Sequence, residues 1–200
     1  MIPACKIAVK HDARTASVGI AASSGNNLQW EQPVANGIST LQDECKTGAN
    51  INQTEMSVKT IHPRTAQQWR QYYQLRWQVL RAPWQQAKGS ERDTLEDSSE
   101  HVMVLSDDNQ PLGVGRVHFN SAAQAQIRYM AVREQARGLG VGTLLLTELE
   151  AIARRHGAGS MVLDARENAV GFYAGHGYEV VGEGHTLFGV IKHQQMRKTL

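Results

Sequence analysis

The spacing of apolar residues indicates a regular fold that begins near residue 56. From there, apolar residues recur at every second position in short runs, as in strands, and at every third or fourth position in longer ones, as in helices. Strands are expected at residues 57–62, 101–106, 112–119, 125–132, 161–165, 178–183 and 187–200. The turn signal "DDNQP" joins two of them into a hairpin. The pattern predicts hairpins first and a strand–helix–strand crossover later.

Three helices are expected between these strands. Thr65 can cap the first, whose apolar stripe comprises Trp69, Tyr72, Tyr73, the stem of Arg76, Trp77 and Leu80. The second follows residue 140 and would bury Val141, Leu144, Leu145, Leu149, Ile152 and Ala153, with Glu150 and Arg154 paired on its outer side. The third is a short helix within residues 167–177. Strands and helices together predict a mixed α/β domain over residues 56–200.

Residues 1–55 differ from the rest of the chain. They are rich in Ala, Ser, Asn, Gly, Thr and Gln and hold no sustained period, so we expect an irregular extension. Met56 stands directly before the organised pattern, which raises the hypothesis that it is the biological start. The two cysteines, Cys5 and Cys45, both lie in this extension. Free thiols in a reducing cytoplasm are the simpler interpretation, and a disulfide is the alternative.

Composition narrows the class of protein. The chain has 200 residues, of which 41% are hydrophobic and 20% charged, as in an ordinary globular protein. A formal net charge of +2 argues against a nucleic-acid partner bound through phosphate neutralisation. No apolar run approaches the ~18 residues that span a bilayer, and the N-terminus shows no secretory signal. We therefore expect a cytoplasmic protein without a membrane or nucleic-acid partner, and a homodimer is left open.

The stretch "ARGLGVG" at residues 136–142 predicts an anion site. The first amides of a helix lack internal partners, and glycines let a phosphate approach the backbone. Arg137 adds a positive charge. A tight turn that uses glycine only for its geometry is the alternative. A dinucleotide fold is excluded because neither register from Gly138 or Gly140 fits G-x-G-x-x-G, and too few residues follow Asp164. A phosphate-binding loop is excluded by the lack of G-K-[ST].

These residues resemble a known family. "QARGLG" at residues 135–140 looks like the Q/R-x-x-G-x-G/A signature of the GNAT acyltransferases. "IRYMAV" is similar to the strand before that signature, and "VLDARENAVGFYAGHGYEVVGE" to the far wall of the cofactor cleft. The likeness covers about residues 56–200. It implies a central, mostly antiparallel twisted sheet with a splayed parallel strand pair and flanking helices.

The resemblance also implies a cofactor and the residues that hold it. Acetyl-coenzyme A would be the acetyl donor. Its contacts would be Met130, Ala131, Val132, Arg137, Gly138, Leu139, Gly140, Val141, Gly142 and Asn168. The uneven apolar spacing around Met130 is compatible with the bulge that such a splay needs. Tyr173 matches the tyrosine near the cofactor sulfur, with core packing as its alternative role. For Asn168 the alternative is a helix cap.

The implied reaction is direct acetyl transfer to a primary amine of a small molecule in a ternary complex. It needs no protein nucleophile, and no metal is expected because the histidines are scattered. Candidate bases by residue type are Glu96, Asp97, His118, Glu183 and His193. Arg76 and Arg128 are candidate acceptor contacts, although Arg128 could instead pair with an acid of "ERDTLED". A protein-modifying acetyltransferase and a non-catalytic acyl-coenzyme A binding module remain alternatives.

Overall fold

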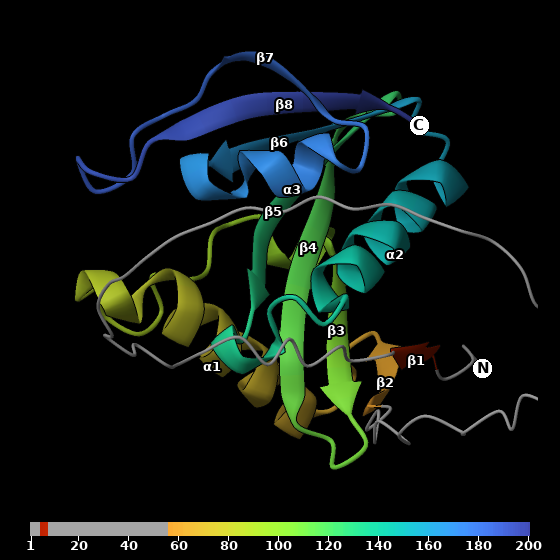
Figure 1. Ribbon diagram of the computed structural model, residues 1–200, viewed down its shortest axis with the longest axis vertical. Helices are drawn as coiled ribbons and strands as arrows, with labels where there is room; N and C mark the ends of the chain where they lie inside the picture. Colours follow the sequence, from red (N-terminus) through yellow and green to blue (C-terminus); the bar gives the residue numbers. More distant parts are fainter. Residues whose placement is uncertain (1–4, 8–55) are drawn as a thin grey trace, which may run out of the picture. The chain divides into compact units, whose positions relative to one another are not determined.

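The computed structural model describes residues 5–7 and 56–200, which form one eight-stranded sheet with helices on both faces (Figure 1). The strands lie in the order β1-β2-β3-β4-β5-β6-β8-β7. Their bounds are Cys5–Ile7 (β1), Met56–Ile61 (β2), Glu100–Ser106 (β3), Pro111–Ser121 (β4), Gln124–Val132 (β5), Ser160–Arg166 (β6), Glu179–Glu183 (β7) and His193–Thr199 (β8). All neighbouring strands are antiparallel except β5 and β6, which are parallel. The predicted mixed α/β class is therefore confirmed.

The helices are α1 (Ala66–Leu80), α2 (Val141–Arg155) and α3 (Val170–Ala174), and four single 3₁₀ turns lie at residues 82–84, 96–98, 134–136 and 167–169. The expectation of a strand over residues 187–200 is wrong for its first part. Leu187 and Ile191 form only an isolated bridge, because the loop turns back on itself there. Strand β1 is a short piece of structure within residues 1–55 that the sequence did not predict. The remaining predictions for that extension, including its cysteine pairing, lie outside the described residues.

The two faces of the sheet carry separate apolar clusters. Successive residues of a strand point to opposite faces, so β3 contributes to both. Val102 and Val104 pack in the cluster under α2 and α3, whereas Met103 and Leu105 pack in the cluster under α1. Helix α1 starts at a capping box in which Thr65 and Gln68 bond each other's backbone amides. The predicted N-cap is thus confirmed, and α1 occupies one face while α2 and α3 occupy the other.

A buried ion-pair network fixes the connection between α1 and β3. Arg76 and Arg116 have fully buried side chains, and both bond the carboxylate of Glu96. Arg116 also bonds Asp93 at 2.6 Å. Burial raises the pKa of Asp93, but hydrogen bonds from Arg116 and the Leu95 amide outweigh it, so the net pKa lies well below its usual range. Asp93 and Glu96 are therefore charged at neutral pH, and their two negative charges balance the positive charges of Arg76 and Arg116.

This network corrects two predictions. Arg76 is buried as a whole residue rather than only by its stem, and its guanidinium is occupied by Glu96. It therefore lies in a structural cluster and not at an exposed acceptor contact. Two acids of "ERDTLED", Asp93 and Glu96, pair with Arg116, and none of the described ion pairs includes Arg128. The sequence alone did not show that Arg116, rather than Arg128, pairs with these acids. Both arginines lie in apolar strand patterns, and they sit opposite each other on β4 and β5.

Helix α2 lies close against β4 because the strand carries glycine beneath it. A Cβ on Gly113 would come within 2.8 Å of Leu145 and Val141, and one on Gly115 within 2.8 Å of Leu149. The inner face of α2 matches the prediction with two exceptions: Leu146 is also buried, and Leu144 is only partly buried. Glu150 was expected outside, but it is buried, and Lys198 of β8 bonds both of its oxygens at 2.8 Å. Its predicted partner Arg154 also contacts it, from the exposed side.

The parallel pair β5/β6 separates part of the way along its length. Pairing runs from Gln124 opposite Ser160 to Ile127 opposite Leu163 and then stops, although both strands continue. On its other edge, β5 bulges between Arg128 and Ala131, where the register with β4 shifts. Tyr129 within the bulge has a φ of 55°, which is unusual for a bulky residue. The predicted bulge at this point is confirmed, and it opens a cleft between the two strands.

Candidate functional site

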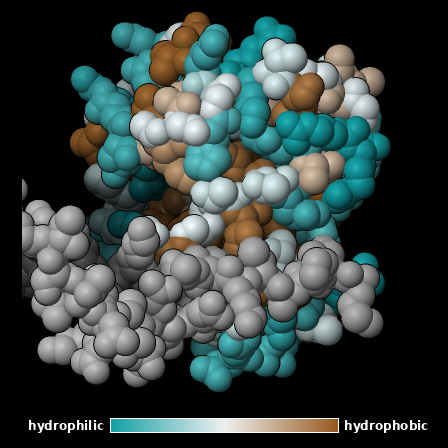
Figure 2. Space-filling model, turned by 45° about the vertical axis from the view of Figure 1, so that its right-hand side comes forward, coloured by the Kyte–Doolittle hydropathy of each residue, from teal (hydrophilic) through white to brown (hydrophobic). Residues whose placement is uncertain are grey.

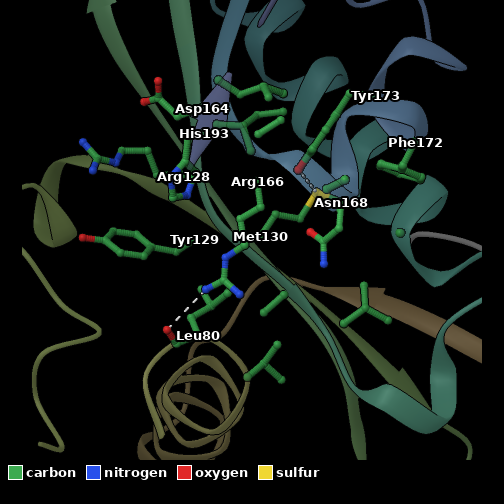
Figure 3. Close-up of a pocket in the computed structure, with 18 of the residues that line it drawn as sticks. Leu80, Arg128, Tyr129, Met130, Asp164, Arg166, Asn168, Phe172, Tyr173 and His193 are labelled. Atoms are coloured by element: carbon green, nitrogen blue, oxygen red, sulfur yellow. Dashed lines mark hydrogen bonds between the residues drawn. The ribbon is translucent and has the colours of Figure 1, made fainter. Parts of the chain in front are cut away.

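A cavity of about 660 Å³ occupies this cleft. Its walls come from β5, the turn before α2, β6, the segment that carries α3, the end of α1 and the loop before β8. Figure 2 shows apolar side chains gathered in a hollow on this side of the molecule, with hydrophilic side chains around its upper rim. The close-up in Figure 3 shows Met130 reaching toward Tyr173 and Tyr129 pointing the opposite way, with the side chain of Arg166 between them.

One end of the cavity is the N-terminus of α2. Gly138 and Gly140 lie in the left-handed region with φ of 76° and 79°, and Gly140 is the N-cap. No side chain of the described residues caps this helix. Its first amides therefore face the cavity with the positive end of the helix dipole behind them, next to Arg137. Such an end can hold a phosphate group.

Most of the predicted cofactor contacts line this cavity: Met130, Ala131, Val132, Arg137, Gly138, Gly140, Gly142 and Asn168. Leu139 and Val141 do not, and Val141 is buried in the core beneath α2. Asn168 is exposed in the 3₁₀ turn before α3. The alternative role of Asn168 as a helix cap is wrong, because Arg166 and Ala169 hold the N-cap positions there. Its side chain is left facing the cleft (Figure 3).

Tyr173 projects from α3 into the middle of the cavity. It is 8% exposed, and its hydroxyl lies 3.6 Å from the sulfur of Met130 across the cleft (Figure 3). Phe172 packs edge-on against it with ring centroids 5.1 Å apart. Burial raises the pKa of Tyr173, so its hydroxyl stays protonated at neutral pH and can donate a proton. Tyr173 belongs to the core cluster as well, so the two roles considered from the sequence coexist in one residue.

His193 is the candidate base that lines the cavity. Its Nδ1 lies 3.0 Å from the carbonyl oxygens of His185 and Ile191, which only a protonated nitrogen can satisfy. The neutral ring therefore keeps its lone pair on Nε2. Burial lowers the pKa of His193 most, and although its hydrogen bonds to the carbonyls of His185 and Ile191 raise it, the net pKa stays below its usual value. A neutral histidine with Nε2 as its basic atom is thus present at neutral pH.

The other candidate bases lie elsewhere. Glu96 is held in the ion-pair network, and His118 is buried on β4 outside the cavity lining. Asp97 and Glu183 are exposed and do not line the cavity. Arg128 does line it, with its guanidinium 5.5 Å from the Tyr129 ring.

Sequence reasoning missed two charged residues of the cavity wall, Asp164 as a wall residue and Arg166, whereas it placed Arg81 on the acceptor side, where the structure also has it. The alternation in "MVLDAR" carried a usable signal, because Leu163 and Ala165 face the core and the charged residues between and after them must face the other way. Arg81 is the C-cap of α1, at the end of the aromatic segment that pointed to the acceptor side.

Comparison with known proteins shows the family. The model of the acetyltransferase (GNAT) family matches residues 69–178, more than half of the chain. The uncharacterized N-acetyltransferase YjcF of Bacillus subtilis is 37% identical over 108 residues, which are 54% of this chain and 76% of that protein. The chain therefore belongs to the GNAT acetyltransferase family, and the predicted family and enzyme class are confirmed.

Solved structures agree with the fold. An acyl-CoA N-acyltransferase from Pseudomonas aeruginosa superimposes with a TM-score of 0.60 at 24% identity, over 72% of this chain and 99% of that one. A GNAT family acetyltransferase from Elizabethkingia anophelis, solved with acetyl-CoA bound, gives 0.56 at 15% identity, over 72% and 98%. At these identities the likeness establishes the arrangement of elements. None of the described helices is long and apolar enough to cross a membrane.

Proposed function

We propose that this protein transfers an acetyl group from acetyl-coenzyme A to a primary amine of a small molecule, directly and within a ternary complex. The observation that carries the proposal is the end of β5–β6 pairing beside an uncapped helix N-terminus. A strand edge and a phosphate site then lie in one cavity. A donor with an extended, amide-bearing arm and a pyrophosphate needs the strand edge for its arm and the phosphate site for its pyrophosphate.

The described residues fit such a donor. The pyrophosphate would accept hydrogen bonds from the amides of residues 137–142. Glycine at positions 138 and 140 has no side chain that would obstruct it. The β6-facing edge of β5 beyond Ile127 has no strand partner among the described residues. The pantetheine arm can therefore bond there in the manner of an added strand, beside Met130, Ala131 and Val132.

Three groups of the chain then serve the reaction. Acetyl-coenzyme A supplies an acetyl group activated as a thioester. A backbone amide on the open edge of β5 would polarise the thioester carbonyl. As the acceptor nitrogen bonds to the acetyl carbon and the carbon–sulfur bond breaks, Nε2 of His193 takes the surplus proton from the nitrogen. Tyr173 gives its proton to the departing sulfur and regains one from solvent.

The donor site is tested by Gly140→Asp, matched with Gly157→Asp. Both glycines have the same left-handed conformation, with φ of 79° and 81°, but Gly140 is the N-cap of α2 and Gly157 follows its C-cap. Acetyl-coenzyme A should raise the Tm of the wild type and of Gly157→Asp, because a ligand selective for the folded state stabilises it. Gly140→Asp should lose that shift, since a carboxylate enters the phosphate site. A folded Gly140→Asp variant with a normal shift would place the donor elsewhere.

Tyr173→Phe should lower kcat by roughly ten- to a thousandfold, within or somewhat below the usual range for general acid–base groups. A thiolate whose thiol has a pKa of about 8.5 leaves fairly well unaided, which sets the lower bound. The Kd for acetyl-coenzyme A should barely change because the ring remains. Steady-state kinetics and a binding titration give the two quantities. If kcat is normal in a folded variant, Tyr173 has only a packing role.

The role of His193 is tested by the pH dependence of kcat/KM. Because its pKa is lowered below the usual ~6.5, the wild type should lose activity through this group only at mildly acidic pH, where Nε2 becomes protonated. His193→Gln should lower kcat by roughly a hundredfold and remove that ionisation, leaving only the titration of the acceptor amine. His156→Gln, on the exposed end of α2, is the control. An unchanged acid limb in His193→Gln would exclude His193 as the base.

A further inference from the structure

The cavity has two chemically different halves, one on each face of the sheet. Leu163 and Ala165 of β6 point toward α2 and α3, so the residues that alternate with them, Asp164 and Arg166, point toward the α1 face. His193 pairs directly with Arg166 in the β6–β8 register and therefore shares that face. The donor site lies at the α2 end, so the half on the α1 face is the part available to the acceptor.

Two arginines of that half converge on a single neutral oxygen. Nη1 of Arg81 and Nη2 of Arg166 lie 3.3 Å and 3.4 Å from the carbonyl oxygen of Leu80. Figure 3 shows Arg166 reaching across the cleft to that carbonyl. The two residues are far apart in sequence and come from opposite walls. A carbonyl at the end of α1 carries only a partial negative charge, so it cannot neutralise two guanidinium groups.

The remaining charges do not balance this pair. Arg81 also donates to the carbonyl of Ser90, and the buried Glu91 beside it accepts its hydrogen bond from the Gly89 amide instead. No carboxylate of the described residues lies within ion-pair distance of Arg81 or Arg166. Arg76 and Arg116, which are equally part of the α1 face, both have their carboxylates. The chain thus neutralises its structural arginines and leaves this pair open.

Burial makes the open pair unfavourable without a counter-ion. The pKa of Arg166 is lowered by burial and then by the positive potentials of Arg81 and Arg137, and burial also lowers the pKa of Arg81. Both side chains line the cavity. An oxyanion placed between them would be bound by charge-assisted hydrogen bonds from two planar donors, which suits a carboxylate or a phosphate.

We propose that Arg81 and Arg166 form an oxyanion site, so that the acceptor is an amine that also carries a carboxylate or phosphate. This inference rests on the proposed function. Asp164, on the same face of β6 as Arg166, would attract the acceptor's ammonium group, which loses one proton to solvent before attack; His193 would then take the second proton as the carbon–nitrogen bond forms. The acceptor is therefore an amino-acid-like or phosphoamine compound rather than a polycation.

Matched acceptor pairs test the site, with thiol release from acetyl-coenzyme A as the readout. Glycine is compared with glycinamide, glutamate with glutamine, and O-phosphoethanolamine with ethanolamine. At least one anionic member should exceed its partner tenfold or more in kcat/KM, and whether it is a carboxylate or a phosphate identifies the anion. Arg166→Gln should abolish that preference, whereas Arg166→Lys should keep part of it because the charge remains. Arg197→Gln, on the exposed part of β8, should leave it intact.

The outcomes separate the two proposals. If acetyl-coenzyme A gives no thermal shift and no acceptor-dependent thiol release, the proposed function itself fails. If acetyl-coenzyme A stabilises the protein but no anionic amine is preferred to its neutral partner, the oxyanion site is wrong. A preference that survives in Arg166→Gln also overturns it. A merely structural role of Arg166 would instead weaken acetyl-coenzyme A binding and the reaction of neutral and anionic amines alike.

Discussion

The fold and the site both depend on the point at which β5 and β6 stop pairing. Four residue pairs hold the strands in parallel register up to Ile127 and Leu163, and beyond them both strands continue without each other. An unpaired strand edge inside a protein costs free energy unless something else bonds its amides and carbonyls. The open edge is therefore a part of the sheet that is prepared to receive an extended ligand.

The ion-pair network under α1 stabilises the bulge of β5 at which this strand separates from β6. Tyr129, in its strained left-handed conformation, lies with its ring 3.6 Å from the Arg76 guanidinium and donates its hydroxyl to Asp93 at 3.1 Å. Arg76 is fixed in turn by Glu96. Residues at sparsely populated φ values persist when their surroundings over-determine them, and these contacts do so. The loop between α1 and β3 thus helps to fix the shape of the cleft.

Much of this arrangement was predictable from local sequence. The capping residue Thr65, the helix after Gly140 and the bulge near Met130 each left a pattern within a few positions. The partners of charged residues left no such pattern. The local sequence around a charged strand residue is the same whether its side chain faces a carboxylate or a cavity. Arg116 therefore went unnoticed, Glu150 was placed outside, and the pairing of Arg81 with Arg166 depends on two segments that meet only in the folded chain.

The most direct test of donor binding in the cleft is a titration of the ¹⁵N-labelled protein with acetyl-coenzyme A, followed through its backbone amide resonances. Binding in the cleft predicts that the largest shifts fall in two segments distant in sequence, residues 130–132 on the open edge of β5 and residues 138–142 at the start of α2. Amides of β2 and β3 should move little. Saturable binding that leaves both cleft segments unshifted would contradict the site.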